Sequence, residues 1–335
     1  MKKLVKVLVV EDDLSHAELI NRAFESHRQD FKVNFRHNLS EAFQYLTIEL
    51  PDIVICDWML PDGRGSEILQ ADPEKLLFPV VVMTSHGNEE LAVEAMKAGA
   101  LDYVVKSPDT FAQMPDFVLR EIREWEHIIA RRSAEMKLQQ VLLQTVEALA
   151  VLVEKRDPYT SGHQKRVSQL STMIALHMHL NPDAIHGIYI ASILHDIGKI
   201  TIPSEFLNKP GKLEPMEFTI IKTHPQMAHD MLKSIDFNTP VAEIILQHHE
   251  RLDGSGYPRG LKDSDILLEA KILTVADVVE AMASHRPYRA SLGIDAALDE
   301  ISQNAGTLYD PMVVNCCLEL FRSERFTFIE KGPVS

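Results

Sequence analysis

The second half of the sequence is rich in residues that bind transition metals. The chain has 15 histidines in 335 residues, and most of them lie after residue 160. Seven histidines and aspartates of this region are candidate ligands: His163, His195, Asp196, His224, His248, His249 and Asp277. Imidazole nitrogen and carboxylate oxygen together suit Fe, Mn, Co, Ni and Zn. These residue types therefore predict a transition-metal site.

The spacing of these residues lets them converge. Successive groups lie roughly 24 to 32 residues apart, which suits one helix–loop–helix excursion. Adjacent ligands on one helix point about 100° apart, so Asp196 can reach a second metal while His195 binds the first. Two metals roughly 3.5–4 Å apart activate water and stabilise an in-line phosphate displacement. The pattern therefore indicates phosphoester hydrolysis. The remaining histidines, such as His16, are expected to be packed or solvated.

The first half of the sequence alternates strand-like and helical segments. Five strands are predicted, at Val5–Val10, Phe31–Phe35, Asp52–Cys56, Pro79–Met83 and Tyr103–Val105. Apolar residues at helical spacing lie between them, at His16–Glu25, Glu41–Leu50 and Glu89–Ala98. This alternation predicts a doubly wound, five-stranded parallel sheet with helices on both faces.

Polar residues stand where these predicted strands end. They are Glu11, Asp12, Asp57, Thr84 and Lys106. Ligands bind beyond the carboxyl ends of parallel strands, and three clustered carboxylates need a cation to stay ionised. Mg²⁺ takes oxygen ligands and leaves positions open for phosphoryl oxygens, and an Asp beside it can attack a phosphoryl group. The sequence thus predicts a magnesium-dependent phosphoacceptor site.

The chain after residue 156 is expected to be all-helical. Asn181-Pro182-Asp183, for example, has a capping residue, a proline and an acid in the order that starts a helix. Residues 117–155 form a charged helical stretch that leaves two interpretations open: pairing with its copy in a homodimer, or a linker helix packed on its own domains. We expect three parts, at residues 1–120, 121–140 (a connecting helix) and 141–335.

The first half resembles the receiver domains of response regulators, which have a flavodoxin-like fold. The matching segments are Val9-Val10-Glu11-Asp12-Asp13, Asp57-Trp58-Met59-Leu60-Pro61-Asp62-Gly63, Thr84-Ser85 and Lys106. This resemblance implies that Asp57 is phosphorylated by a sensor histidine kinase, with Glu11 and Asp12 as magnesium-site acids. It also implies a backbone carbonyl ligand from Met59 and a switch aromatic at Tyr103. Lys106-Ser107-Pro108 replaces the common Lys-Pro, which affects the following loop and not the lysine.

The second half resembles the HD-GYP family of metal-dependent phosphohydrolases. The matching segments are Arg156–His163, His195-Asp196-Ile197-Gly198-Lys199, Lys209–Leu213, Lys222–Pro225, His248–Pro258, Val275-Ala276-Asp277 and Arg286-Pro287-Tyr288-Arg289. This family hydrolyses cyclic di-GMP to linear pGpG and, in some members, to GMP. The resemblance makes the seven candidates named above metal ligands, with Fe or Mn favoured. It gives His195, Asp196 and Lys199 catalytic roles, and it assigns substrate contacts to Lys199, Tyr257, Arg286 and Arg289.

Three positions depart from the family pattern. Tyr159 stands where members with three metals have Glu, which favours two metals here. Glu280 replaces a common Asp after Asp277, and His285 replaces a common Asp before Arg286. Neither change removes a predicted ligand.

Composition limits the partners. The formal net charge of −15 disfavours DNA binding through a basic patch. No apolar run reaches the roughly 18 to 20 residues that span a bilayer, so we expect a cytoplasmic protein without membrane insertion. Cys56, Cys316 and Cys317 fit neither a disulfide framework nor a zinc motif, and we expect buried thiols.

The leading hypothesis is a response regulator in which phosphorylation of Asp57 controls a cyclic di-GMP phosphodiesterase. The sequence does not give the direction of control. One alternative is a catalytically weak HD-GYP scaffold that binds partner proteins. Another is a phosphohydrolase for a different cyclic dinucleotide, because Tyr257 and the paired arginines favour a ligand with two phosphates without identifying its bases.

Overall fold

The chain folds into two compact units, Met1–Leu138 and Gln139–Ser335. The structure is a computed structural model, and it describes residues 4–69, 77–85, 89–156, 162–209, 211, 213–284, 292–323 and 325–328. Each unit has its own apolar core.

The first unit contains the predicted five-stranded parallel sheet. Its strands are β1 (Val5–Val10), β2 (Phe31–Arg36), β3 (Ile53–Asp57), β6 (Val80–Thr84) and β7 (Asp102–Val105). They run in the order β2-β1-β3-β6-β7, and every neighbouring pair is parallel. The order reverses direction between β1 and β3, and in such sheets the ligand site lies at this switch point, at the carboxyl ends of the strands.

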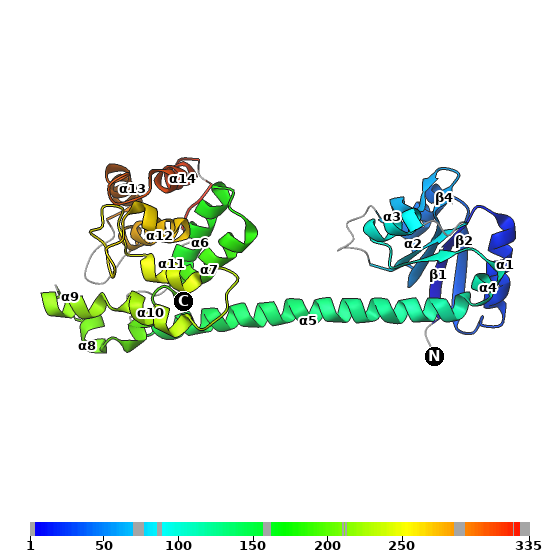
Figure 1. The fold of residues 1–335 in the computed structure, drawn as a ribbon, viewed down its shortest axis with the longest axis horizontal. Coiled ribbons are helices and arrows are strands. Elements are labelled where there is room, and N and C mark those ends of the chain that lie inside the picture. The colour runs from blue at the N-terminus through cyan, green and yellow to red at the C-terminus, as the bar shows by residue number, and fades with distance from the viewer. Residues whose placement is uncertain are drawn as a thin grey trace, which may run out of the picture. The chain divides into compact units, whose positions relative to one another are not determined.

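Helices cover both faces of this sheet (Figure 1). Alternate residues of β1 face opposite ways: Leu8 and Val10 belong to the core under α2 (Leu39–Ile48) and α3 (Glu89–Lys97). Val7 and Val9 belong to the core under α1 (Leu14–Glu25) and α4 (Pro108–Ala112). Because all four residues are buried, β1 reads as a continuous apolar run, as a central parallel strand should.

The segment after β3 contains structure that the sequence did not predict. β4 (Met59–Leu60) and β5 (Gly63–Arg64) pair antiparallel, and a 3₁₀ helix, η1 (Gly65–Leu69), follows them. Strands of two residues are too short to show a period in the sequence. A Cβ on Gly65 would stand 2.3 Å from the carbonyl oxygen of Asp57, so this turn packs tightly against the end of β3.

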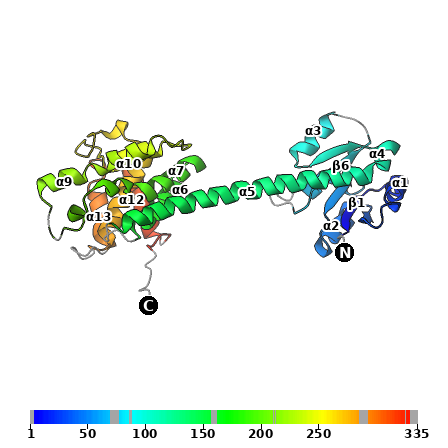
Figure 2. The ribbon, with the colours of Figure 1, turned by 90° about the horizontal axis from the view of Figure 1, so that it is seen from below.

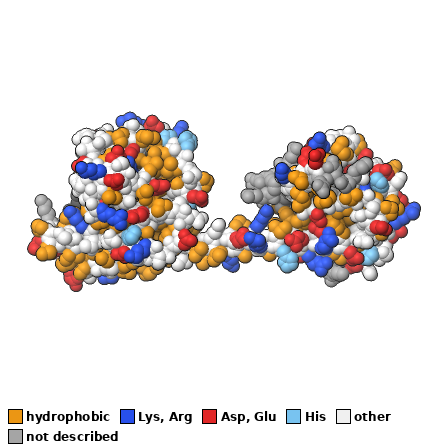
Figure 3. Space-filling model, in the orientation of Figure 1, with side chains coloured by type: hydrophobic (Ala, Val, Ile, Leu, Met, Phe, Trp, Pro, Cys, Tyr) orange, Lys and Arg blue, Asp and Glu red, His pale blue; other side chains and the backbone are white. Residues whose placement is uncertain are grey.

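Helix α5 (Met114–Glu154) is 41 residues long and matches the helix predicted at 117–155. Its first turns bury Met114 and Val118 in the first unit, and its last turns bury Ala150 and Val153. Apolar and charged side chains are exposed together along it (Figure 3). An 18-residue window of α5 has a mean hydropathy of 1.3 and is 11% buried, so this helix is long and apolar enough to cross a membrane. The expectation that no segment is long and apolar enough to span a bilayer is therefore wrong for this window of α5.

The second unit is helical, as predicted. Its elements are α6 (His163–His177), α7 (Pro182–Leu194), η3 (Ile197–Thr201), α8 (Ser204–Leu207), α9 (Pro215–Ile221), α10 (His224–Leu232), α11 (Val241–Gln247), η4 (Asp263–Asp265), α12 (Leu268–Ala283), α13 (Ile294–Gln303) and α14 (Pro311–Arg322). Asn181 caps α7 as expected, because its Oδ1 accepts a hydrogen bond of 2.8 Å from the Ala184 amide.

Helix α12 lies at the centre of this unit. It packs against α6, α7, α11, α13 and α14 (Figure 2). Its residues Ile272, Leu273, Val275, Ala276 and Val279 are fully buried. An acidic residue on this helix is therefore surrounded by other elements and takes its partners from them.

Candidate metal centre and phosphoacceptor site

The candidate metal ligands stand at helix ends around the central helix. His163 and His224 are the first residues of α6 and α10, His195 and His248 follow the last residues of α7 and α11, Asp196 precedes η3, and Asp277 lies on α12. Although they stand at helix ends, these four histidines are at most 4% exposed, so several helices direct ligands inward to one point. The structure thus brings together residues that are far apart in the sequence.

Six of these residues form two triads that share no member, and a third group, His195, Asp196 and His248, overlaps both. Ligand atoms of His163, His195 and Asp277 lie within 4.8 Å of one another, and so do those of His224, His248 and His249. Their rings are also in contact, since the His195 and His248 centroids are 5.1 Å apart. Two adjacent groups of nitrogen and oxygen donors offer a binuclear arrangement.

Asp196 lies between the two triads. Its Oδ2 is 3.5 Å from Nε2 of His195, and its Oδ1 is 3.6 Å from Nε2 of His224. Its Oδ2 also accepts a hydrogen bond of 2.8 Å from Nζ of Lys199. Burial opposes its charge, but Lys199 and the surrounding histidines hold the pKa of Asp196 well below its usual value. This carboxylate is therefore ionised and can serve both sides of the cluster.

Backbone carbonyls fix the orientation of three histidines. The Nδ1 atoms of His195, His224 and His248 lie 2.7, 2.8 and 2.6 Å from the carbonyl oxygens of Ser192, Ile221 and Ile245. Each carbonyl belongs to the residue three positions earlier. With Nδ1 as the donor, each Nε2 presents a lone pair to the cluster, the form in which imidazole binds metals.

Two of these Nε2 atoms are buried without a hydrogen-bond partner, those of His224 and His248. Burial lowers the pKa of His224 to about 4 and that of His248 to about 3, so both rings are neutral at physiological pH. A buried, neutral and unpaired acceptor is costly unless a ligand satisfies it. These residues therefore fit a divalent metal.

His163 is held differently, by a carboxylate. Its Nδ1 is bonded to Glu280, and its Nε2 is 3.2 Å from Oδ1 of Asp277. Glu280 is itself held by Arg166 at 2.6 Å and by the Ser284 hydroxyl at 2.6 Å. Burial opposes a charge on His163, but the hydrogen bonds to Asp277 and Glu280 outweigh it and raise the pKa of His163 to about 9. The sequence marked Glu280 only as a departure from the family pattern and gave no sign of this contact.

A tight loop places Tyr257 over the cluster. Its ring centroid is 4.7 Å from that of His249. A Cβ on Gly256 would stand 2.4 Å from the Glu250 Cα, so only glycine permits this close approach. Glu250 is buried and accepts hydrogen bonds from the amides of Arg259 and Leu261, at 2.7 and 2.9 Å, which ties the loop together. The predicted contacts Arg286 and Arg289, and the departures Tyr159 and His285, lie outside the described residues.

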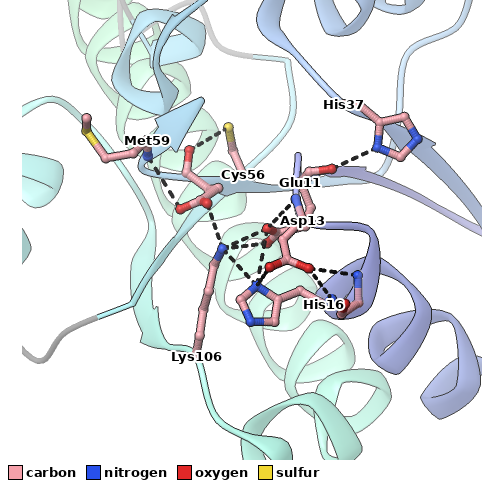
Figure 4. A network of polar contacts seen from close by, with 9 residues as sticks. Glu11, Asp13, His16, His37, Cys56, Met59 and Lys106 are labelled. Carbon is pink, nitrogen blue, oxygen red and sulfur yellow. Dashed lines mark hydrogen bonds and ion pairs between the residues drawn. The ribbon is translucent and has the colours of Figure 1, made fainter. Parts of the chain in front are cut away.

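The phosphoacceptor candidates meet at the carboxyl edge of the sheet in the first unit. Oxygens of Glu11, Asp12 and Asp57 lie within 4.8 Å of one another. Nζ of Lys106 is 2.6 Å from Oδ2 of Asp57 and 2.8 Å from Oε1 of Glu11 (Figure 4). Burial disfavours the lysine's charge, but these two carboxylates outweigh it and raise the pKa of Lys106. Three acids with one ammonium form a site that fits a divalent cation and a phosphoryl group.

The other predicted residues of this site take different positions. Thr84 is buried at the end of β6, and the Met59 amide is 3.4 Å from Oδ1 of Asp57. Tyr103 is 39% exposed on β7. The sequence missed His16, whose Nδ1 lies 3.4 Å from Glu11 Oε1 and 3.5 Å from Lys106 Nζ. Figure 4 shows Lys106 and His16 both turned toward Glu11. A lone histidine at the start of a helix gives no signal for such a contact.

Comparison with known proteins agrees with both halves. Residues 7–114 match the model of the response regulator receiver domain, and residues 147–313 match that of the HD domain. The chain is 32% identical to the cyclic di-GMP phosphodiesterase response regulator RpfG of Xanthomonas campestris over 332 residues, which covers 94% of this chain and 87% of that protein. It is 34% identical to a cyclic di-GMP phosphodiesterase of Thermotoga maritima over 336 residues, 94% of this chain and 90% of that one.

A further relative and a solved structure match part of the chain. The 3'3'-cGAMP-specific phosphodiesterase 3 of Vibrio cholerae is 36% identical over 166 residues, covering 50% of this chain and 36% of that protein. The crystal structure of a putative response regulator from Chloroflexus aurantiacus covers 36% of this chain and 99% of its own, with 25% identity and a TM-score of 0.32.

Fold and site together define a receiver domain joined to an HD-type phosphohydrolase domain. The chain belongs to the family of response-regulator phosphodiesterases with an HD-GYP domain, and it is an enzyme of that class. HD-domain phosphohydrolases depend on metals, and the histidine–aspartate cluster supplies the donors.

Proposed function

We propose that this chain hydrolyses cyclic di-GMP to linear pGpG, with GMP as a further product, under the control of phosphorylation at Asp57. The observation that carries the hydrolysis is the pair of buried, unpartnered Nε2 atoms of His224 and His248 beside the Asp196 carboxylate. The two relatives that align along almost the whole chain bear the name cyclic di-GMP phosphodiesterase, which supports the choice of substrate.

We assign two divalent metals to the cluster: its mixed nitrogen and oxygen donors suit several transition metals, and the family resemblance favours Fe or Mn. One would be held by His163, His195 and Asp277, the other by His224, His248 and His249, with Asp196 shared between them. When bound, two such metals supply Lewis-acid activation of water and of the phosphate. Tyr159, which stands where members of the family with three metals have Glu, supports two metals over three.

Side chains of the protein balance the charge of the site, position its groups and limit the access of water. Asp196 and Asp277 remain ionised in a buried site, so they offset the positive charge placed there. Lys199 holds Asp196 in place and would contact the attacked phosphate. Tyr257 covers His249 and limits access of bulk water to that side. Arg286 and Arg289 are assigned to the substrate by the family pattern alone.

Control would begin at Asp57. A sensor histidine kinase would transfer its phosphoryl group there, with Mg²⁺ held by Glu11, Asp12 and the Met59 carbonyl, and with Lys106 and Thr84 on the phosphoryl oxygens. Residues 1–120 would form the regulatory part, 121–140 the connecting helix and 141–335 the enzymatic part. Exposed apolar side chains along α5, such as Leu142 and Leu152, support pairing of two copies through this helix.

The acidic charge and the family membership also support a cytoplasmic protein that binds neither DNA nor a membrane. Apolar residues at the two ends of α5 are buried, and the exposed apolar residues along it are assigned to the pairing of two copies and not to a bilayer.

The decisive test is turnover of cyclic di-GMP by the full chain after anaerobic reconstitution with Fe(II) or Mn(II). Wild type should release pGpG, and His195→Ala should release none. If wild type gives no more product than His195→Ala, the enzymatic proposal fails for this substrate and the scaffold alternative takes its place. Product chromatography separates pGpG from GMP.

A second candidate substrate is 3'3'-cGAMP. The observation that favours it is the 36% identity over 166 residues to the cGAMP-specific phosphodiesterase 3 of Vibrio cholerae. Competition between the two cyclic dinucleotides in one assay decides between them, because the ratio of their turnover equals the ratio of kcat/KM.

A further inference from the structure

Lys222 stands between two aromatic rings next to the metal cluster. It follows the last residue of α9 and precedes His224 by two positions. Its Nζ is 4.7 Å from the ring centroid of Phe218 and 5.2 Å from that of Tyr257. The Tyr257 ring in turn stacks on His249, at 4.7 Å between centroids. One aromatic ring therefore separates the Lys222 ammonium from a candidate metal ligand.

The ammonium of Lys222 has no carboxylate partner among the residues that the structure describes. The cations nearest the cluster differ in this respect, since Lys199 is paired with Asp196 and Arg166 with Glu280. Aromatic faces hold a cation loosely, at roughly 0.5–2 kcal/mol, and leave its three N–H donors unused. Lys222 is thus positioned by its neighbours while its donors remain available for an anion.

The neighbouring Tyr257 contacts both Lys222 and the cluster residue His249. Its ring centroid is 5.2 Å from Lys222 Nζ and 4.7 Å from the His249 ring centroid. A ligand that extends from the cluster past this ring would therefore come within reach of Lys222.

We propose that Lys222 binds the second phosphate of the cyclic dinucleotide, the one that is not attacked in that turnover. This inference rests on the proposed function. A cyclic dinucleotide carries two phosphodiesters, and the metals neutralise only the one that reacts. The other needs a cation at a distance from the cluster, and a charge-assisted hydrogen bond from an ammonium supplies it. Lys222 is then a residue that determines specificity for substrates with two phosphates.

The test uses Lys222→Gln, which removes the charge and leaves a polar side chain that is one atom shorter. For cyclic di-GMP, KM should rise roughly tenfold or more while kcat stays within about twofold, because a charge-assisted contact made equally in the ground and transition states is lost. Bis(p-nitrophenyl) phosphate has a single phosphate, and its kcat/KM should not change. Lys222→Arg should keep KM for cyclic di-GMP close to the wild-type value.

Two controls complete the design. Lys233→Gln removes the same charge from an exposed lysine that is paired with Asp230 at 2.7 Å, and it should leave KM unchanged. In the His195→Ala background, equilibrium binding of cyclic di-GMP should weaken by the same factor when Lys222→Gln is added, with unchanged thermal unfolding.

The possible outcomes are distinct. An unchanged KM for cyclic di-GMP overturns the inference. An equal loss of kcat/KM for cyclic di-GMP and for bis(p-nitrophenyl) phosphate also overturns it, because Lys222 then supports the metal site. If Lys222 contacts guanine, Lys222→Gln raises KM for cyclic di-GMP and not for cyclic di-AMP. If it contacts phosphate, the variant raises KM for both dinucleotides by the same factor. A wild type without cyclic di-GMP turnover would instead overturn the proposed function.

Discussion

Glu280 accepts a hydrogen bond from Nδ1 of His163 inside the second unit. The other three histidines with a described Nδ1 contact in the cluster, His195, His224 and His248, are bonded to backbone carbonyls instead. A carboxylate behind a histidine fixes the ring and makes it a stronger ligand. Arg166 and Ser284 hold Glu280 for this role.

We therefore predict that Glu280→Gln lowers metal affinity about 10- to 100-fold. Titration of the metal-free protein with Mn(II) or Co(II) measures the affinity directly, and the absorption spectrum of the Co(II) form reports any change in the ligands. Glu243→Gln is the matched control, because Glu243 pairs with Arg259 at 3.1 Å on α11 and should not affect binding. If Glu280→Gln binds the metal with wild-type affinity, the hydrogen bond between His163 and Glu280 does not strengthen metal binding.

The fold was largely predictable because its signals are local. The buried parallel strands read as apolar runs, and the observed strands begin or end within one residue of the predicted bounds. The pair β4–β5 was missed because strands of two residues around Pro61-Asp62 look like a turn. The length of α5 followed from its lack of internal glycine and proline, since Pro115 stands in the first turn, where a missing N–H costs nothing.

The sequence motifs predicted the ligands of the site but not the residues that hold those ligands in place. Ligand types and spacing indicated which residues meet, but the partners behind them depend on three-dimensional packing. Glu280 lies 117 residues from His163 in sequence, and no local pattern links the two. His16 was expected to be packed or solvated, yet the fold of α1 brings it to Glu11 and Lys106.

The low pKa values of His224 and His248 predict how the metal-free protein responds to acid. An unfolded histidine takes up its proton near pH 6.5. In the folded protein, burial lowers the pKa of His224 to about 4 and that of His248 to about 3. Between pH 6.5 and 4 the unfolded state therefore binds protons that the folded state does not. The free energy of unfolding must fall as pH drops through this window.

His224→Asn tests this relation. The asparagine amide can still donate to the Ile221 carbonyl, but it does not titrate. Urea unfolding in EDTA at several pH values from 7.5 to 4.5 should give a smaller fall in unfolding free energy for the variant than for wild type. Equal pH slopes in the two proteins would mean that the pKa of His224 is the same in the folded and the unfolded state.

Phosphorylation of Asp57 should change phosphodiesterase activity. Lys106 pairs with Asp57 at 2.6 Å, and a phosphoryl group on Asp57 would replace this contact and move the lysine. Treatment with acetyl phosphate and Mg²⁺ should shift the turnover of cyclic di-GMP by wild type and leave that of Asp57→Ala unchanged. Asp109→Asn, an exposed acid in the first turn of α4, should respond as wild type does. Identical activity and oligomeric state in all treated samples would contradict control through this site.

Gly198→Ala should destabilise the metal centre through the backbone. A Cβ at position 198 would stand 2.0 Å from the carbonyl oxygen of His224 and 2.8 Å from the Ala228 amide nitrogen, so η3 and α10 would have to separate. We expect a loss of about 1–3 kcal/mol in the unfolding free energy, together with weaker metal binding, because Asp196 and His224 lie on the two elements that move apart.

The double variant Gly198→Ala/Ala228→Gly distinguishes a backbone clash from a side-chain clash. Shortening Ala228 removes its methyl group but leaves the two clashing backbone atoms in place. The double variant should therefore be no more stable than Gly198→Ala in urea unfolding, and glycine in helix α10 should cost it roughly 0.5–1 kcal/mol more. Recovery of wild-type stability or metal content in the double variant would show that side chains, and not the close approach of η3 to α10, require glycine at position 198.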